Sequence, residues 1–481
     1  MRGGDNRMSL NPREIAAEEG DALKAPTGRL RRELSSFAVL MLTLSSLSPV
    51  VSVFGVGGDV LHQAGAGAAL LFGSAILAAL VWSVVYAELG SAYPYSGGDY
   101  VGVGRVLGGW AGVVTLALWA CTIGPSIAFA AETLAPYVAQ FAPWIPAPIV
   151  TFGGLAGALG VALLSVRRGA WITGLFLAVE AVAVVALIVV GAGRPARGLD
   201  AIVLHPMALN AAGGLAPVAL SVLGLGAISA VYATVGGNQA INFGEELHDP
   251  HKRMGPVVLA ACLIGAFATA TPIVLVVMHA PDLGALLRSP APFAQFLSAA
   301  LGPWAGPALS AGVALAIFNA NIVGIMGGAR LYFSLGRDGL FPAPVNRLLS
   351  GVDLHSGTPR VATWVIGAFS AACCFVPEHA LLVFISGLLV YGWSLVCLAV
   401  LIGRIKGLTG AGGYWRSPLF PLAPIAGLAM AVAFTIADLL DPDAGRPSLL
   451  LLGLVVIAAL AWYHFVLRPR GWAPQLGENE G

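Results

Sequence analysis

The stretch that decides the fold reads SSLSPVVSVFGVGG at residues 45–58, inside the first long apolar segment of the chain. Pro49 removes a helical hydrogen bond, and Gly55, Gly57 and Gly58 are poor helix formers. A helix break at membrane depth leaves backbone groups unpaired, which is tolerated only where they face protein, water or a ligand. If the segment lies in a membrane, this stretch predicts an interrupted helix beside a functional site.

The composition places the chain in a membrane. Of 481 residues, 58% are AVILMFWYC and only 10% are charged, against about 25% in ordinary globular domains. These apolar residues are too many for one water-soluble core but would fill about twelve bilayer spans of roughly 20 residues. The net charge of +1 gives no positive surface potential that would attract nucleic acid. The five cysteines lack CxxC spacing and indicate neither disulfides nor a zinc site. We therefore expect contact with the lipid bilayer, and no metal or cofactor.

Twelve apolar segments follow residues 1–33, which we interpret as a cytoplasmic tail without a cleaved signal. With both termini in the cytoplasm, 21 of the 25 Lys and Arg residues fall on the inner side, as the positive-inside rule favours. A different number of helices would distribute Lys and Arg more evenly between the two sides, so we expect a multi-pass protein of the cell membrane. The expected helices lie at 35–60, 66–91, 107–138, 146–166, 170–192, 211–242, 256–281, 302–336, 361–377, 379–402, 419–440 and 447–467.

The sixth segment carries a second set of helix-breaking residues. Gly236 and Gly237 precede a polar pair at 238–239, and Gly224 and Gly226 lie earlier. Breaks in segments one and six fit a five-plus-five inverted repeat with a midplane site, although glycines also serve simply for close helix packing. We expect an all-α integral membrane fold of about twelve helices. Its parts are a tail at 1–33, the first repeat at 34–192, an extracellular loop at 193–210, the second repeat at 211–402, helices eleven and twelve at 403–467, and a cytoplasmic tail at 468–481.

Three stretches on the predicted cytoplasmic side carry a family resemblance. They are AELGSAYP at 87–94 running into GGDY at 97–100, GEELHDP at 244–250 with Pro256 beyond, and Arg330 with GRDGLFP at 336–342 and TPR at 358–360. In order and spacing they resemble the helix-two, helix-six and helix-eight exits of the amino acid–polyamine–organocation (APC) superfamily, bacterial amino acid permease type. The resemblance spans about residues 35–467. It implies a secondary transporter of amino acids or related amines that works by alternating access.

Several of these motif residues are charged and lie near predicted cytoplasmic helix ends. Glu88, Glu245 and Glu246 fall there together with basic residues such as Arg105. We expect ion pairs that hold or gate the inner mouth, without contact to the substrate. The other basic residues near this mouth are Arg167, Lys252 and Arg253.

The resemblance places the substrate at the unwound backbone of helices one and six, where half-helix ends offer free N–H and carbonyl groups. Aligned on Gly65, VVSVF at residues 50–54 stands where the family usually has Gly-Ser-Gly-Ile-Phe. Val50 and Ser52 thus replace glycines that let a ligand approach the backbone. The preceding Pro49 still removes a helical hydrogen bond, so a binding break is retained in altered form.

In helix six, Gly236 aligns with the family glycine nine residues before Glu245. Gly237 stands where relatives carry a bulky aromatic residue, and so predicts a roomier pocket. Tyr232 and Phe54 are candidates for aromatic walls, with ordinary core or lipid-facing packing as the alternative. The expected substrate-binding residues are Val50, Val51, Ser52, Phe54, Tyr232, Thr234, Gly236, Gly237 and Asn238.

Glu180 is the most informative single residue. It lies near the middle of an apolar helix, where an acidic group is costly enough to indicate function. Thr173, seven residues earlier, shares its helical face. Some members of the resembled family carry a lysine in this neighbourhood that replaces a coupling cation. We predict that Glu180 exchanges a proton during transport; the alternative is a protonated glutamate bonded to another helix.

Coupling to sodium is not expected. Related folds use Ser and Thr hydroxyls of helix eight for that ion, and the matching stretch here reads AIFNAN at 316–321. Proton coupling or exchange, as a symporter or an antiporter, is therefore favoured. Asn319 and Asn321 point to different faces, so at most one should line the pathway, while the other bonds between helices.

These sequence features bear on three classes of function. The first is an amino acid permease, proton-coupled or exchanging. The second transports a polyamine or another amine without a carboxylate, which Val50 and Glu180 would suit. The third is a membrane-embedded enzyme or receptor, which would need a catalytic cluster or a sensor domain, and no HExxH or GxSxG motif with partners is present. We predict a permease of a small-molecule substrate that is not an enzyme; the sequence leaves the substrate, the direction and the oligomeric state open.

Overall fold

A computed structural model describes residues 34–95, 98–163, 180–193, 195–210, 212–244, 247–353 and 358–472, and every structural statement below refers to these residues. Long apolar helices dominate this part of the chain, which confirms the all-α class. The α-helices are α2 Ser36–Leu47, α3 Gly57–Ala64, α4 Gly67–Ala92, α5 Asp99–Leu107, α6 Gly109–Val138, α7 Ala147–Ala162, α9 Leu199–Val203, α10 Leu220–Thr234, α11 Pro250–His279, α12 Leu283–Arg288, α13 Pro292–Leu301, α14 Ala305–Arg337, α15 Ala343–Leu349, α16 Arg360–Cys373, α17 Glu378–Ile405, α18 Leu422–Leu440 and α19 Gly445–Trp462.

Eight helices of the described chain are long and apolar enough to cross a membrane. They are α4, α6, α10 with the turn after it, α11, α14, α17, α18, and α19 with its extension to Arg470. Shorter apolar helices, among them α7, Glu180–Gly191 and α16, lie in three further segments that the sequence predicts to be spans. A multi-pass membrane protein is thus confirmed. The division into two inverted repeats stays a prediction.

Helix one is interrupted next to Pro49, as predicted. The first half, α2, ends at Leu47, and Ser48 has a φ of 41°, in the left-handed region. A residue before proline is disfavoured in the right-handed helical conformation, so the break falls at Ser48 and ahead of Val50. The chain then continues as the π-helix η1, Val51–Val56, and as α3.

Helix six is interrupted at its glycines, also as predicted. The first half, α10, ends at Thr234, Val235 is extended, and a 3-10 helix, η2, runs over Gly237–Phe243. The two breaks touch, because a Cβ built on Gly236 would lie 1.6 Å from Cδ2 of Leu47. A side chain at position 236 would therefore force helices one and six apart.

The predicted helix at 211–242 begins too early. Strands β1, Met207–Leu209, and β2, Leu215–Pro217, form an antiparallel hairpin, and α10 begins only at Leu220. The turn is built by Asn210, whose Oδ1 accepts hydrogen bonds from the N–H groups of Ala212 and Gly214. Gly213, at φ 78°, supplies the left-handed residue of this turn. The loop predicted between helices seven and eight is also partly helical, since it contains α12 and α13.

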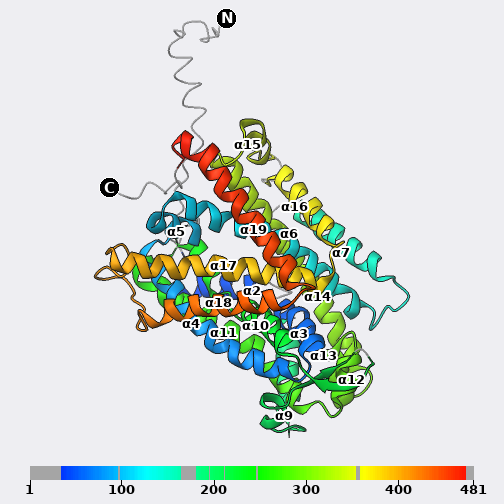
Figure 1. Ribbon diagram of the computed structural model, residues 1–481. Helices are drawn as coiled ribbons and strands as arrows, with labels where there is room; N and C mark the ends of the chain where they lie inside the picture. The colour runs from blue at the N-terminus through cyan, green and yellow to red at the C-terminus, as the bar shows by residue number, and fades with distance from the viewer. Residues whose placement is uncertain are drawn as a thin grey trace, which may run out of the picture.

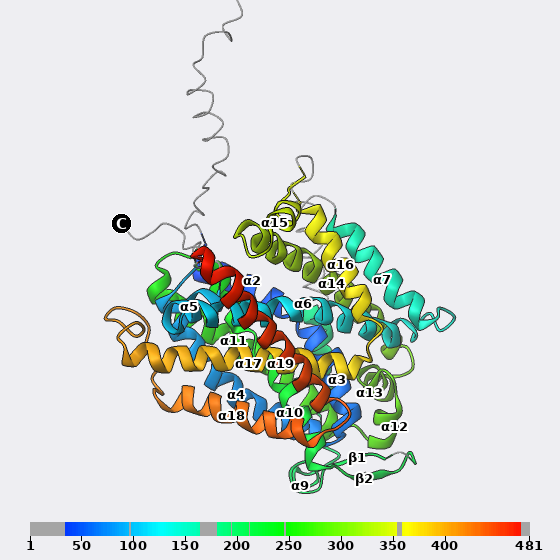
Figure 2. The same cartoon turned by 45° about the horizontal axis from the view of Figure 1, so that its top comes forward.

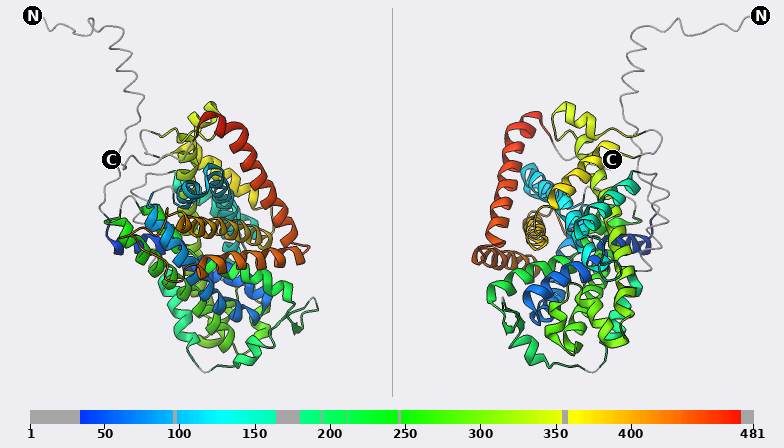
Figure 3. Two further views of the ribbon diagram at one scale, coloured as in Figure 1. Left: turned by 60° about the vertical axis from the view of Figure 1, so that its left-hand side comes forward. Right: turned by 90° about the vertical axis from the view of Figure 1, so that its right-hand side faces the viewer.

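The helices form a bundle with two distinct ends. In Figures 1 and 2, α15 lies at one end and α9 at the opposite end, near α12 and the hairpin. Inside the bundle α4 packs extensively against α11. Figure 3 shows α19 at the edge of the molecule in both views. Only three of its residues are buried, which is the pattern expected of a helix that faces lipid.

Candidate functional site

A cavity of about 470 Å³ lies at the two helix breaks. Both broken helices contribute to its wall, together with α6, α14, α17 and the start of α5. It extends from the breaks to Asp99 and Tyr100 at the start of α5 and to Leu331 in the last third of α14. The cavity therefore extends from the middle of the bundle toward the end that holds α5 and the C-terminus of α14.

Five of the nine predicted substrate-binding residues line this cavity. Val51 and Ser52 face it from η1, and Tyr232, Gly236 and Asn238 face it from helix six. The structure thus brings together residues about 180 positions apart in the sequence, as the two-break prediction requires. That they bind substrate stays a prediction.

Three of the other predicted residues have packing roles. Val50 is fully buried and is not part of the cavity wall. The Phe54 ring packs edge-on against Tyr137 and Phe293, with ring centroids 5.7 and 5.4 Å apart. The Thr234 hydroxyl donates to the Ala230 carbonyl of its own helix at 3.0 Å. None of the three faces the cavity in this conformation.

Gly237 corrects the expectation of a roomier pocket. A Cβ on Gly237 would lie 2.5 Å from the Val258 carbonyl oxygen and 2.6 Å from the Cys262 nitrogen. The missing side chain therefore lets η2 pack closely on α11 and adds no space to the cavity. The sequence places Gly237 at the break in helix six, where it lies. It does not show whether this position faces the cavity or the neighbouring helix α11.

Cys262 supports the break in helix six, a role that the sequence did not suggest. Its thiol donates to the Ala79 carbonyl at 3.5 Å, and its sulfur is approached by the backbone N–H groups of Gly236 and Gly237. Cys262 thus lies directly against the backbone of the break. A cysteine in an apolar run indicates only core packing, so no sequence signal pointed to this role.

Glu180 lies beside the break in helix one. Its side chain is only 3% exposed and borders the cavity. Its Oε2 accepts a hydrogen bond from the Ser48 hydroxyl at 3.4 Å, and the Val50 backbone N–H also interacts with the carboxylate. A carboxylate in this position can hold either a proton or the ammonium group of a ligand. Thr173, expected on the same helix face, lies outside the described residues.

Asp99 is a second carboxylate in the cavity wall, which sequence reasoning treated only as part of a loop motif. It begins α5 directly after Gly98, whose φ is 69°. Its Oδ2 accepts hydrogen bonds from the Tyr86 hydroxyl at 2.9 Å and from Trp119 Nε1 at 3.1 Å. Burial raises the pKa of Asp99 above its ordinary value, and the hydrogen bonds from Trp119 and Tyr86 offset this only in part.

The two asparagines of α14 face different surroundings, as predicted. Asn319 lines the cavity, and its buried Oδ1 has no hydrogen-bond partner in the described chain. Asn321 is fully buried away from the cavity, but its amide has no hydrogen-bond partner in the described chain, so the expected bond to another helix is not formed. The wall residues given by the structure include two carboxylates but no Lys, Arg or His. The Asn319 Oδ1 is therefore a free hydrogen-bond acceptor in the wall of the cavity.

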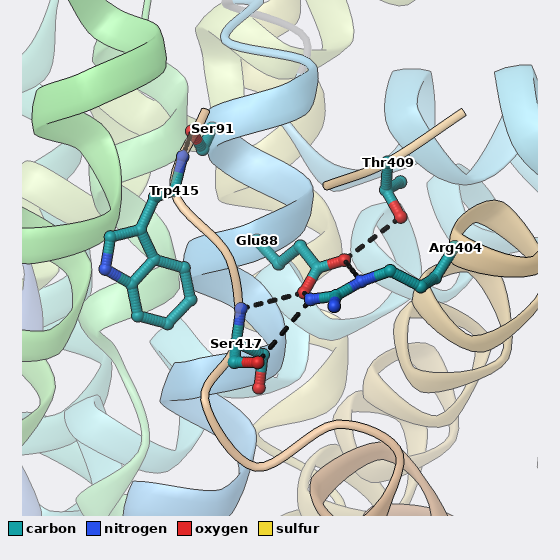
Figure 4. Close-up of polar contacts among 6 residues, drawn as sticks. All are labelled: Glu88, Ser91, Arg404, Thr409, Trp415 and Ser417. Carbon is teal, nitrogen blue, oxygen red and sulfur yellow. Dashed lines mark hydrogen bonds and ion pairs between the residues drawn. The ribbon is translucent and has the colours of Figure 1, made fainter. Parts of the chain in front are cut away.

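Glu88 of the predicted cytoplasmic gate is at the centre of a buried network (Figure 4). Its carboxylate pairs with Arg404 at the C-terminal end of α17. It also accepts from the Thr409 hydroxyl at 3.1 Å and from the Ser417 N–H at 2.9 Å. The network ties the end of α4 to α17 and to the loop that follows it.

Arg105, the other described residue of the predicted gate, does not join this network. Arg105 is exposed, and no ion pair is formed by it within the described ranges. Glu245 and Glu246, as well as Arg167, lie outside the described residues. The basic partner of Glu88 is thus Arg404, which lies 316 positions later and was not among the expected partners. We find no group of three or more His, Cys, Asp or Glu side chains placed to hold a metal within the described ranges.

Comparison with known proteins agrees with these features. The family model described as amino acid permease matches residues 34–460. An uncharacterized transporter of Mycobacterium tuberculosis is 28% identical over 380 residues, 76% of each chain. Branched-chain amino acid permeases of Bacillus subtilis and Lactococcus lactis are 24% and 27% identical, covering 80% and 78% of this chain and 84% and 83% of their own lengths. With two touching helix breaks around a central cavity, and a family match over most of its length, the chain belongs to the amino acid permease family.

Proposed function

We propose that the protein moves amino acids across the cytoplasmic membrane by alternating access, with Glu180 as the group that carries a coupled proton. The observation that carries this proposal is the position of Glu180, a buried carboxylate that borders the central cavity beside the break in helix one. Burying an acidic group among apolar membrane helices costs free energy, so its presence there indicates a functional role. Proton exchange at this place would link the charge of the cavity to the conformation of the break.

The substrate would bind between the two breaks, against Val51 and Ser52 on one side and Gly236 and Asn238 on the other. Carbonyl groups at the end of α2 lack helical partners and suit the substrate ammonium group. Asn319, with its unpartnered Oδ1, is the side chain best placed to add a hydrogen bond. The absence of a Ser or Thr pair at 316–321 favours coupling to protons, or exchange, over sodium.

The similarity to branched-chain amino acid permeases directs the choice of substrates. Apolar side chains such as Ile123, Ile127 and Leu389 form part of the cavity wall. We therefore propose neutral amino acids with apolar side chains as the first compounds to test, with leucine, isoleucine and valine in the first pool. The distribution of Lys and Arg supports the proposal that both termini lie in the cytoplasm.

Replacing Glu180 by glutamine tests the proposal. Glutamine keeps the shape and hydrogen-bonding capacity but cannot titrate, so proton-driven accumulation in liposomes should fail while exchange of internal for external substrate survives. If Glu180 instead binds the substrate amine, equilibrium binding, accumulation and exchange should all weaken, because losing the charge partner at a desolvated site costs about 2–5 kcal/mol.

The matched control for this test is Glu132→Gln. Glu132 is a carboxylate in the long helix α6 that does not belong to the cavity wall. It should leave accumulation and exchange unchanged. Wild-type behaviour of Glu180→Gln in all three assays would remove Glu180 from the transport cycle, and a steep requirement for sodium at fixed pH would contradict proton coupling.

A second candidate function is transport of an amine that lacks a carboxylate. It is favoured by one observation: the described cavity wall carries Asp99 and Glu180 but no basic side chain. Such a cavity attracts cations. Competition in liposomes separates the two functions, because an aliphatic diamine should displace a bound amine substrate while leaving leucine uptake unaffected if the substrate is a neutral amino acid.

A further inference from the structure

A second and much smaller cavity, of about 40 Å³, lies at the N-terminal end of α17. It is bordered by Asp59 and Gln63 of α3, by His379 of α17, by Asp441 beyond the end of α18, and by residues of α10. Its volume holds one or a few water molecules but no amino acid. The opposite end of α17 carries Arg404 of the network at Glu88. The two polar clusters therefore lie at opposite ends of the bundle.

The central contact of this small cavity is a histidine–carboxylate hydrogen bond between two helices. His379 Nδ1 lies 2.9 Å from Asp59 Oδ2, and the two side chains are 31% and 12% exposed. Asp59 belongs to α3, the part of helix one beyond its break. Both partners are linked to the central cavity: α3 continues directly from η1, which borders it, and α17 contributes Leu389 and Trp393 to its wall.

Three carboxylates surround the imidazole of His379. Besides Asp59 of α3, they are Glu378 of α17 itself and Asp441 from the segment after α18. Glu378 accepts from the Thr133 hydroxyl of α6 at 2.7 Å, and the residues that α10 contributes to the cavity are uncharged. Each element around the imidazole thus supplies either an acidic side chain or no ionisable one.

Asp441 remains ionised over the range in which histidine titrates. Burial tends to raise its pKa, but the backbone N–H groups of Ala444, Gly445 and Asp443 donate to it and hold the pKa below its ordinary value. Its charge is therefore constant near neutral pH. Asp441 therefore contributes nothing to a change in the interaction between Asp59 and His379 in this range.

We propose that Asp59 and His379 form a pH-sensitive latch that holds α3 against α17 on the side of the central cavity away from α5. Histidine gains its charge between about pH 5 and 8. The protonated imidazole forms an ion pair with Asp59, whereas the neutral imidazole contributes only a single uncharged hydrogen bond. The latch therefore tightens in acid and loosens in alkali. It regulates the alternating-access cycle proposed above, because opening this side requires α3 to separate from α17.

Apolar packing closes the same side independently of pH. Phe54, five residues before Asp59, packs against Tyr137 and Phe293, and the Tyr137 hydroxyl donates to the Phe54 carbonyl at 2.9 Å. These contacts do not change their charge near neutral pH. The latch supplies the pH-dependent part of the closure, and its removal leaves the aromatic contacts to hold α3.

Amide hydrogen exchange of α3 tests the latch in the full-length protein, reconstituted in lipid nanodiscs without substrate. After correction for the intrinsic effect of pH on exchange, the protection of α3 should be about fivefold higher at pH 6 than at pH 8, the magnitude of a partly exposed ion pair. His379→Gln cannot be charged, so most of the difference in α3 protection between the two pH values should disappear. Asp59→Asn removes the other charge and should have the same effect.

The matched control is His62→Gln on the same helix. His62 Nε2 contacts the Ser289 carbonyl oxygen at 2.8 Å and has no carboxylate partner there, so this variant should keep the wild-type pH dependence. The double exchange of Asp59→His with His379→Asp should restore the dependence that each single variant lacks. The proposal is overturned if His379→Gln keeps the full pH dependence, if His62→Gln abolishes it equally, or if the folded double exchange restores none of it.

This measurement separates the latch from the proposed function. Hydrogen exchange of α3 needs no substrate, whereas the role of Glu180 is read from accumulation and binding. A failure of proton coupling at Glu180 would leave the pH dependence of α3 intact. A failure of the latch would leave the accumulation defect of Glu180→Gln intact.

Discussion

Replacing Glu88 by alanine should destabilise the protein by about 3 kcal/mol. Glu88 is fully buried, and its carboxylate accepts hydrogen bonds from Arg404, Thr409 and Ser417. Removing one partner of a buried ion pair costs about 3–5 kcal/mol, because the remaining charge is left uncompensated. Arg404 keeps 23% of its side chain exposed, so water partly solvates the orphaned charge and the lower end of this range applies.

The free energy of unfolding can be measured on purified protein in mixed micelles by titration with a denaturing detergent. Glu88→Ala, Arg404→Ala and the double variant form a cycle, and the double variant should lose less than the sum of the two singles because it leaves no orphaned charge. Arg253→Ala is the matched control: its pair with Asp249 has a separation of 4.0 Å and side chains 51% and 73% exposed. It should change stability by less than about 1 kcal/mol.

Two results would refute this reasoning. In the first, Glu88→Ala unfolds no more easily than Arg253→Ala, which would mean that the network contributes no more than a surface ion pair. In the second, the losses of the two single variants add fully in the double variant, which would mean that the two charges do not stabilise each other. The thermal midpoint of the same variants should follow the same order.

Three further predictions concern the cavity and its breaks. Gly236→Ala should destabilise the protein by about 1–3 kcal/mol through its clash with Leu47, and Leu47→Ala should relieve part of this cost in a detergent-unfolding assay. Asn319→Leu should weaken substrate binding, measured by calorimetry, whereas Asn321→Leu should leave affinity unchanged; equal losses would contradict the placement of Asn319. Burial raises the pKa of Asp99, so ionisation of this side chain opposes folding. The free energy of unfolding of the wild type should therefore fall relative to that of Asp99→Asn as pH rises from about 4 through the raised pKa. A constant difference between the two proteins from pH 4 to pH 8 would contradict this.

The helix breaks could be predicted because their causes are local. Pro49 disfavours the helical conformation of the residue before it, and the break falls at Ser48. The glycine at 236 marks the second break in the same way. The depth of Glu180 in an apolar segment likewise pointed to the cavity it borders. Each of these signals is carried by a few adjacent residues.

The remaining features depend on contacts between distant segments. No sequence feature near Glu88 identifies Arg404 as its partner, because the pair is formed by the packing of α4 against α17. Gly237 shows a second limit: a missing side chain can open space or allow close packing, and only the neighbouring helix α11 decides which. In the hairpin before α10, apolar residues flank the turn residues Asn210 and Gly213, so the sequence pattern there resembles a continuous apolar helix.

The pairing of Glu88 with Arg404 also affects how the protein folds while it is being synthesised. At about 5–20 residues per second, synthesis takes roughly 15 to 60 s to proceed from one partner to the other, which lies 316 positions later. During this time α4 is in place while its buried carboxylate lacks the arginine that neutralises it. The C-terminal end of α4 can therefore reach its final packing only after α17 and the loop beyond it have been made. Nascent chains that stop before Arg404 should leave this end of α4 open to a protease or a chaperone.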